Sequence, residues 1–240
     1  MTKKPSNNVK EIMSAVIVAA GRGTRMNLEQ NKQYIDVLGK PILARTLQVF
    51  EDCIAIDEII VVVNEQDIIY CKENVIDRYN LLKVKALVTG GAERQNSVYN
   101  GLLQVDPRCS LVIIQDGARP FISKDCIYAG IEAAKDFGAA CMAVPVKDTI
   151  KKSDSEGFVH ETIDRSMLWS IQTPQIFKYD LIMNAHKEAT KSNFLGTDDA
   201  VLIERLGLRL KLVMGSYDNI KITTIEDLAV AEAILERRGQ

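Results

Sequence analysis

The chain has 240 residues, of which 47% are apolar and 26% charged, so it is long enough to bury one sizeable hydrophobic core. Its net charge of −2 argues against broad binding to nucleic acid or to a membrane surface. No apolar run approaches the length of a membrane-spanning helix. Residues 1–11 are mostly polar and lack the apolar stretch of a secretory signal, so we expect a loose tail before a single cytoplasmic domain over 12–240.

The sulfur and imidazole side chains exclude two common kinds of site. The five cysteines are odd in number and form no C-x-x-C pair, which argues against a zinc site and predicts reduced, mostly buried thiols. His160 and His186 lie far apart, with no serine or cysteine motif beside either. A histidine-based catalytic triad is therefore not expected.

Short, nearly continuous apolar runs alternate along the chain with segments of helical periodicity. The predicted strands are residues 15–20, 59–63, 85–88, 111–115, 139–144 and 208–213. The predicted helices are residues 41–50, 66–79, 94–104, 124–137, 179–191 and 226–237. Strands that are apolar on both faces and alternate with helices predict an α/β fold, with a mainly parallel sheet covered by helices on both faces. Ligands of such folds bind at the carboxyl ends of the strands.

Three helix starts carry recognisable signals. Pro41 suits the first position of the helix over 41–50. Thr223 and Glu226 have the spacing of a capping box for the last helix. Asp198 and Asp199 are expected to start a further helix, because carboxylates favour the positive N-terminal end.

Residues 146–165, "VKDTIKKSDSEGFVHETIDR", interrupt the alternation. The segment predicts two short strands that flank a turn over 153–157, within a hairpin spanning about 146–166. It has too few apolar residues to fold alone. Two interpretations stay open at this point, a surface hairpin and an arm that packs on another subunit.

The segment "AAGRGTRM", residues 19–26, follows the first predicted strand and has the glycines of a phosphate-binding loop. It is not a dinucleotide fingerprint, because Met26 occupies the third glycine position and no acidic residue follows about 20 residues on. It also lacks the second glycine and the lysine of a Walker loop. Arg25 and Lys32 add positive charge that suits a polyphosphate, although an ordinary turn with solvated side chains is the alternative.

The motifs of the chain resemble those of a known enzyme family. "AAGRGTRM" followed by "NKQY" and "GKPIL" is similar to the signature of nucleotidyltransferases that join a sugar or polyol phosphate to a nucleotide. The later motifs narrow the resemblance to the 2-C-methyl-D-erythritol 4-phosphate cytidylyltransferases. They are "GGAERQNSVYNGL" (90–102), "DGARPF" (116–121), "VPVKDTIK" (144–151), "DRSMLWSIQTPQIF" (164–177), "TDDA" (197–200) and "NIKITTIEDLAVAE" (219–232).

The ribitol-5-phosphate cytidylyltransferases share the first loop and several later motifs. They carry a Ser-Val version of "DGARPF" and lack the "DR…LW" pattern before "QTPQ". This chain has Gly117-Ala118 and Asp164-Arg165 followed by Leu168-Trp169, so it resembles the methylerythritol enzymes more.

The resemblance implies a Rossmann-like sheet with a protruding β-hairpin arm, and a homodimer that exchanges these arms. It implies that a phosphate oxygen of methylerythritol 4-phosphate attacks the α-phosphorus of CTP and releases pyrophosphate. Such a reaction needs positive charge rather than a general base. Mg²⁺ is expected to be bound mainly through the CTP phosphates, and no metal-ligating side chains are predicted. Neither nucleic acid nor a membrane is an expected partner.

The same resemblance assigns roles to residues that face the nucleotide. Arg25 and Lys32 would stabilise charge on the α-phosphoryl group and on pyrophosphate, and Lys221 would reach the phosphates of both substrates. The backbone of Ala19, Ala20, Gly21 and Gly23 would wrap the triphosphate. Gly91, Ala92 and Ser97 would hold cytosine and ribose, although Ala92 stands where the family often has Asp.

Other residues are expected to bind the acceptor. Asp116, Ala118 and Arg119 follow the fourth predicted strand, and Asp116 would bind polyol hydroxyls, lie near the metal, or only cap a turn. Thr173 would line the substrate pocket. Thr149 and the catalytic Arg165 bracket the arm and would bind the partner's substrate phosphate. The alternative for Arg165 is an ion pair within the arm, with Asp164 or Glu161.

Two other functions stay open on the sequence. One is a ribitol-5-phosphate cytidylyltransferase, against which "DGARP" and Arg165 argue. The other is a non-catalytic nucleotide-binding module, against which the presence of Arg25 and Lys32 argues.

Overall fold

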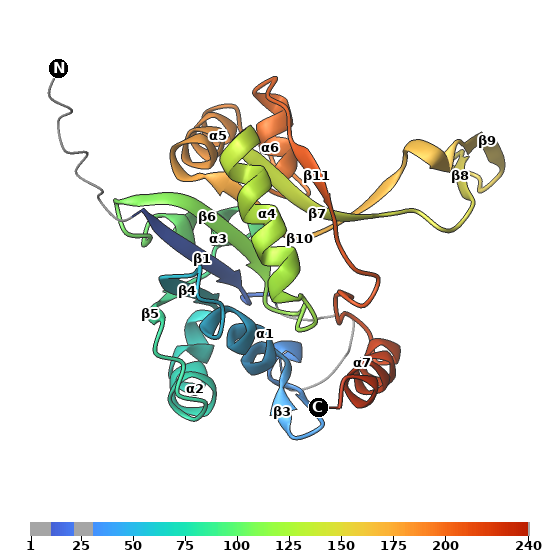
Figure 1. Ribbon diagram of the computed structural model, residues 1–240. Coiled ribbons are helices and arrows are strands. Elements are labelled where there is room, and N and C mark those ends of the chain that lie inside the picture. Colours follow the sequence, from blue (N-terminus) through green and yellow to red (C-terminus); the bar gives the residue numbers. More distant parts are fainter. Residues whose placement is uncertain (1–10, 22–30, 240) are drawn as a thin grey trace, which may run out of the picture.

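A seven-stranded β-sheet runs through the centre of the protein (Figure 1). The structure is a computed structural model that describes residues 11–21 and 31–239. The strands of the sheet are β1 (Ile12–Val18), β4 (Glu58–Val63), β5 (Val84–Thr89), β6 (Cys109–Asp116), β7 (Ala139–Pro145), β10 (Trp169–Lys178) and β11 (Lys211–Met214). Their order is β11-β7-β10-β6-β1-β4-β5, and each neighbouring pair is parallel except those that include β10. The predicted mainly parallel α/β sheet is confirmed.

Strand β10 is not among the strands predicted from the sequence. It pairs antiparallel with β6 and with β7, and its pairing with β7 is interrupted between Ile171 and Gln175. The interruption contains Gln172, Thr173 and Pro174, and a proline cannot donate a hydrogen bond to a neighbouring strand. Because of this polar centre, β10 lacks the continuous apolar run from which the other strands were predicted. The last strand also begins later than predicted, at Lys211 rather than at residue 208.

The helices of the described chain lie between these strands. They are α1 (Ile42–Glu51), α2 (Ile68–Cys71), α3 (Arg94–Leu102), α4 (Lys124–Phe137), α5 (Tyr179–Lys191), α6 (Ala200–Arg205) and α7 (Glu226–Arg237). The predicted bounds of α4, α5 and α7 are confirmed, as is the start of a helix at Asp199, which is the N-terminal cap of α6.

Three local predictions at the helices are corrected. The segment 66–79 is not one α-helix, because α2 passes into a π-helix over Lys72–Asp77. Pro41 is the N-terminal cap of α1 and not its first residue, since its ψ of 143° is extended. At α7, the carboxylate of Asp227 rather than Glu226 accepts the backbone N–H groups of Thr223 and Thr224.

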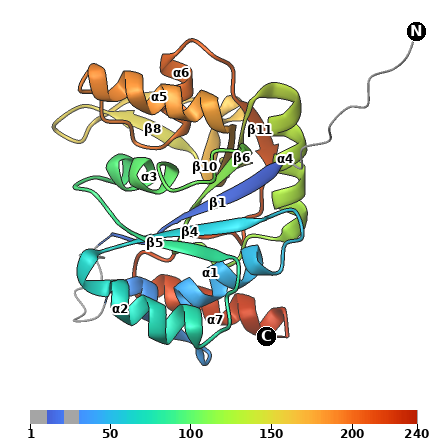
Figure 2. The same cartoon turned by 90° about the vertical axis from the view of Figure 1, so that its left-hand side faces the viewer.

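The central strands are buried on both faces, which explains their nearly continuous apolar sequences. The side chains of β1 point alternately to the two faces of the sheet and belong to two different hydrophobic clusters. Ala15 and Ile17 are in the cluster formed with α1 and α4, while Val16 is in the cluster formed with α3, α5 and α6. Figure 2 shows the helices on the two sides of the sheet. A third cluster joins α7 to Phe121, just after β6, and to Ile222. The C-terminal helix thereby supports the segment that carries Lys221.

The predicted hairpin arm is present and extends away from the sheet (Figure 1). It consists of β8 (Ile150–Ser153) and β9 (Val159–Ile163), which pair antiparallel. A second small hairpin joins β2 (Asp36–Val37) to β3 (Lys40–Pro41). Side chains on the arm are largely exposed, including the apolar Phe158, which is 68% exposed.

The cysteines are mostly buried, as expected from the sequence. All five are free thiols, and Cys53, Cys71, Cys109 and Cys141 are buried. Among the described helices, none has the length and apolar character needed to cross a membrane.

Candidate active site

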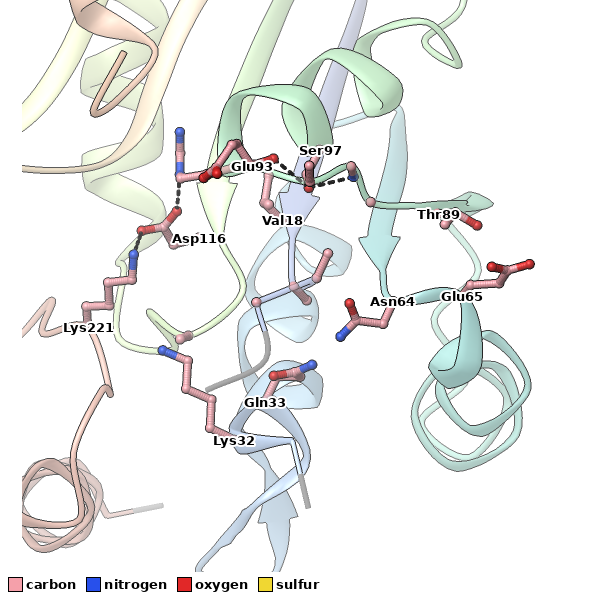
Figure 3. A pocket seen from close by; sticks show the side chains of 18 of the residues that line it. Val18, Lys32, Gln33, Asn64, Glu65, Thr89, Glu93, Ser97, Asp116 and Lys221 are labelled. Carbon is pink, nitrogen blue, oxygen red and sulfur yellow. Dashed lines mark hydrogen bonds and ion pairs between the residues drawn. The ribbon is translucent and has the colours of Figure 1, made fainter. Parts of the chain in front are cut away.

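A pocket of about 680 Å³ lies at the carboxyl ends of the parallel strands (Figure 3). Strands β1, β4, β5 and β6 all end at its wall, and the loops that follow them supply most of its lining. The lining residues are Val18, Ala19, Ala20, Gly21, Lys32, Gln33, Asn64, Glu65, Thr89, Gly90, Gly91, Ala92, Glu93, Arg94, Ser97, Asp116, Ala118, Lys221 and Thr223. This volume is in the range of small-molecule sites, and the position is the one expected for a parallel α/β sheet.

One side of the pocket is a turn of tightly packed backbone between β5 and α3. The N–H of Gly90 donates to the carbonyl of Val63 at 2.8 Å, and the N–H of Gly91 donates to Ser97 Oγ at 3.0 Å. Ser97 Oγ in turn donates to the carbonyl of Glu93 at 3.1 Å. A Cβ at position 90 would lie 2.4 Å from Ala20 Cβ, so glycine is required for the close approach of the two loops. We call residues 89–97 the backbone cradle.

The other side of the pocket is a cluster of charged side chains around Asp116. Its Oδ1 lies 3.1 Å from Arg94 Nε, and its Oδ2 lies 2.7 Å from Lys221 Nζ and 3.9 Å from Arg119 Nε. Burial alone would raise the pKa of Asp116, but Arg94 and Lys221 outweigh it and hold that pKa well below its usual range. Asp116 is therefore ionised at neutral pH.

The charged cluster is held by a strap of residues 219–223 that crosses the end of β6. The N–H of Ile222 donates to the carbonyl of Ala118 at 2.9 Å, and Arg119 Nη1 donates to the carbonyl of Asn219 at 2.7 Å. Asn219 is fully buried and its Nδ2 donates to the carbonyl of Thr173 at 2.9 Å. The strap fixes the backbone of Lys221.

Lys32 approaches the same strap from the first loop region. Its Nζ donates to the carbonyl of Ile222 at 3.3 Å. Figure 3 shows Lys32 and Lys221 on the side of the pocket opposite Asn64 and Glu65. The pocket thus has a cationic side and a side built from backbone and neutral or acidic groups.

Most residues predicted from the sequence for this site lie together in the pocket. Those in the lining are Ala19, Ala20, Gly21, Lys32, Gly91, Ala92, Ser97, Asp116, Ala118 and Lys221. Gly23 and Arg25 lie outside the described residues. Arg119 and Thr173 lie behind the pocket wall rather than in its lining, and Thr173 Oγ1 accepts the backbone N–H of Asp116 at 3.0 Å.

Thr149 and Arg165 do not line this pocket. Both are exposed residues at the base of the hairpin arm, and the Arg165 guanidinium donates to the carbonyl of Lys147. This contact is with the backbone, and it differs from the side-chain ion pair considered as the alternative for Arg165.

Several lining residues were not predicted as site residues. Asn64 and Glu65 follow directly after the strand over 58–63, and Thr89 ends the next strand, so a systematic reading of strand ends would have found them. Arg94 lies inside the motif over 90–102 but carried no signal of its own. Its role depends on contacts with Asp116 and Asp199, which are distant in sequence.

Lys32 and Lys221 place positive charge beside the backbone cradle, and such a pocket suits ligands that carry negative charge. Within residues 11–21 and 31–239, no group of three or more His, Cys, Asp or Glu side chains converges in a way that could hold a metal ion.

Comparisons with known proteins identify the family. Residues 13–237 match the sequence model of IspD, described as 2-C-methyl-D-erythritol 4-phosphate cytidylyltransferase. The chain is 52% identical over 225 residues to the protein of that name from Caldanaerobacter subterraneus subsp. tengcongensis, with 94% of this chain and 99% of that one covered. It is 50% identical over 229 residues to the protein of that name from Clostridioides difficile, with 95% and 96% covered.

Solved structures agree with the sequence comparisons. The crystal structure of 4-diphosphocytidyl-2C-methyl-D-erythritol synthase from Anaerococcus prevotii superposes with a TM-score of 0.84 at 36% identity, covering 95% of this chain and 97% of that one. The 2-C-methyl-D-erythritol 4-phosphate cytidylyltransferase from Thermus thermophilus superposes with a TM-score of 0.79 at 31% identity, covering 94% and 99%. The chain therefore belongs to the 2-C-methyl-D-erythritol 4-phosphate cytidylyltransferase family.

Proposed function

We propose that this protein transfers the cytidylyl group of CTP to 2-C-methyl-D-erythritol 4-phosphate in isoprenoid precursor synthesis. The products are 4-diphosphocytidyl-2-C-methyl-D-erythritol and pyrophosphate. The proposal rests on one observation in a chain of this family: a single pocket contains both the backbone cradle and the cations Lys32 and Lys221. The relatives named above are methylerythritol enzymes, which favours this acceptor over ribitol 5-phosphate.

The proposed reaction is a displacement at the α-phosphorus of CTP. A phosphate oxygen of the acceptor forms the new P–O bond, and the bond from the α-phosphorus to the bridging oxygen of pyrophosphate breaks. The attacking oxygen is already anionic at neutral pH, so no side chain has to remove a proton from it. Lys32 and Lys221 would stabilise the charge that develops on the transferred group and on pyrophosphate, and Arg25 is proposed to join them.

Mg²⁺ is proposed to accompany CTP. Asp116, which lines the pocket, is engaged by Arg94 and Lys221 and is poorly placed to serve as a ligand for a cation. The ion would be bound mainly by the phosphates and by water, and it would neutralise part of their negative charge. The two lysines would then stabilise the remaining charge.

Nucleotide binding is proposed to use mainly the backbone. The closed set of hydrogen bonds among Gly91, Ser97 and Glu93 supports a rigid cradle for cytosine and ribose. Ala92 has no polar side chain with which to contact the base. Base recognition in this chain would therefore depend on backbone groups and on Ser97 rather than on a carboxylate at position 92.

The acceptor is proposed to bind at a site shared by two subunits. Asp116 would accept hydrogen bonds from the polyol, with Lys221 beside it. Thr149 and Arg165 would come from the arm of the partner in a homodimer and bind the acceptor phosphate. The exposure of the arm, including Phe158, supports this exchange, because large apolar side chains exposed on a protruding hairpin favour an interface. Free, mostly buried thiols support a cytoplasmic location.

Pyrophosphate release tests the proposed reaction. The purified protein is incubated with CTP and Mg²⁺, with and without methylerythritol 4-phosphate. We expect release only when both substrates are present. A folded protein that binds CTP and releases no pyrophosphate with the acceptor would instead be a nucleotide-binding module.

A further inference from the structure

A buried carboxylate outside the pocket lining is joined to the charged cluster around Asp116 through one guanidinium. The side chain of Asp199, at the N-terminal end of α6, is 1% exposed. Its Oδ2 lies 2.7 Å from Arg94 Nη1, while Arg94 Nε lies 3.1 Å from Asp116 Oδ1. The planar fork of a single arginine thus bridges two carboxylates that come from different parts of the chain.

On the side away from Arg94, the backbone of Asp199 is fixed by Gln175. The backbone N–H groups of Asp199 and Ala200 donate to Gln175 Oε1 at 3.1 and 2.9 Å. The other carboxylate oxygen, Oδ1, lies 3.6 Å from Nε2 of the buried His186, whose ring stacks on Tyr99. The fixed backbone and the burial of the side chain therefore keep the Asp199 carboxylate close to Arg94, which serves as its hydrogen-bond partner.

The contact between Arg94 and Asp199 has a consequence for Asp116, because three cations share its two oxygens. Arg94 occupies Oδ1, while Lys221 and, more distantly, Arg119 approach Oδ2. If Arg94 lost its contact with Asp199, both of its outer nitrogens could turn toward Asp116 and compete with Lys221. A bridge to Asp199 would keep one oxygen of Asp116 directed at Lys221.

We propose that Asp199 is a positioning residue for the acceptor subsite, which acts through Arg94 on Asp116 and Lys221. This inference rests on the proposed function, because it assigns Asp116 to the acceptor and Lys221 to the place where the phosphates of both substrates meet. It predicts a larger effect on acceptor binding than on CTP binding, since Asp116 belongs to the acceptor subsite. The hydrogen bonds of the cradle join Gly91, Ser97 and Glu93 to one another, and none of them passes through the Arg94 guanidinium.

The variant Asp199→Asn removes the charge with little change of shape. Asp180→Asn is the control, because it removes the same charge from an exposed residue in the first turn of α5. At saturating CTP, we expect D199N to raise the KM for methylerythritol 4-phosphate about tenfold, with the CTP Kd within about twofold of wild type. D180N should leave both constants near wild type. Equal constants in D199N and D180N would overturn the proposal.

A double-mutant cycle separates positioning from general destabilisation. Acceptor Kd is measured by calorimetry with α,β-methylene-CTP present, for wild type, D199N, D116N and the double variant. If Asp199 acts through Asp116, D199N weakens acceptor binding in the wild-type background and has little effect in the D116N background. Additive effects would contradict the proposal.

A second variant keeps the test decisive if D199N does not fold. Arg94→Lys retains a positive charge beside Asp116, but a lysine cannot bridge two carboxylates with a planar fork. We expect the same loss of acceptor affinity with CTP affinity retained, and unchanged acceptor affinity would refute the role of the bridge. A wild-type protein that releases no pyrophosphate would count against the proposed function itself, whereas an active wild type with unaffected D199N and R94K variants would count only against this inference.

Discussion

The ammonium group of Lys221 lies 2.7 Å from Asp116 Oδ2, although Asp116 ends a central strand and Lys221 belongs to a strap near the C-terminus. The ion pair is partly open to the pocket, because the Lys221 side chain is 39% exposed while that of Asp116 is 10% exposed. A carboxylate at the floor of the site therefore holds a lysine at its edge. This arrangement aims a positive charge at the place where we propose that two phosphates meet.

Replacing Lys221 by alanine should lower kcat/KM for pyrophosphate release by about 100-fold or more, because it removes a charge placed for the transition state. Lys187→Ala is the control, since Lys187 is exposed on α5 and carries the same charge. The two variants are compared by steady-state kinetics with methylerythritol 4-phosphate and CTP. A fall of similar size in both would mean that net charge, and not the position of Lys221, matters.

Replacing Arg165 by alanine should raise the KM for methylerythritol 4-phosphate strongly and leave CTP binding nearly intact. The reason is that Arg165 lies at the base of the arm and away from the pocket that its own chain lines. Calorimetry with CTP and steady-state kinetics with the acceptor separate the two effects. Equal loss of CTP binding would refute this role.

Mixing two impaired variants, at an acceptor concentration far below the KM of R165A, tests the exchange of arms. R165A supplies an intact pocket, and Lys32→Ala supplies an intact arm. If subunits exchange at random, about half of the dimers contain one chain of each variant. In such a dimer, the pocket of the R165A chain and the arm of the K32A chain form one intact site, and the second site lacks both residues. About a quarter of wild-type activity should therefore return. Activity that stays at the level of the separate variants after subunit exchange would show that each site is built from one chain.

Replacing Gly90 by alanine should destabilise the protein by about 1–3 kcal/mol and weaken CTP binding. The new Cβ would lie 2.4 Å from Ala20 Cβ and 2.9 Å from Ser97 Oγ, so the two loops would have to separate. Gly21→Ala is the control for stability, because among residues 11–21 and 31–239 no atom outside its chain neighbours lies within 4 Å of a Cβ built there. Urea unfolding and CTP titration give the two quantities, and a G90A protein as stable as wild type would contradict the packing argument.

Stability in acid should depend on Asp199. Burial would raise the pKa of Asp199, but Arg94 and His186 outweigh it and lower that pKa below the ordinary value. A carboxyl group with a lowered pKa in the folded state adds stability that is complete at neutral pH and is lost as the pH falls below about 4. The Asp199→Asn variant should therefore be less stable than wild type at pH 7, by about 1–3 kcal/mol, and lose less stability between pH 5 and pH 3. Urea midpoints at several pH values test this, and parallel curves for the two proteins would contradict it.

Much of the fold follows from local patterns that the sequence displays. Helices α4, α5 and α7 have clear periodicity and ends, so their bounds could be predicted to the residue. Strand β10 could not, because its polar centre around Thr173 serves the site rather than the core. The π-helical turn after α2 likewise has no signal that periodicity alone can distinguish from an α-helix.

The site could be predicted where its residues lie at or just after the end of a strand, as Asp116 and Gly91 do. It could not be predicted where a role depends on contacts across the fold. Arg94 is one such residue, since its two carboxylate partners lie in β6 and before α6. Arg119 and Thr173 show the converse, because their motifs indicated the site but their side chains support its wall from behind.

The proposed function is tested most directly by measuring which acceptor the enzyme uses. Pyrophosphate release is measured with CTP and Mg²⁺ and with methylerythritol 4-phosphate or ribitol 5-phosphate in parallel reactions. We expect rapid release with methylerythritol 4-phosphate and little or none with ribitol 5-phosphate. Release with ribitol 5-phosphate alone would contradict the roles proposed for Asp116 and Arg165.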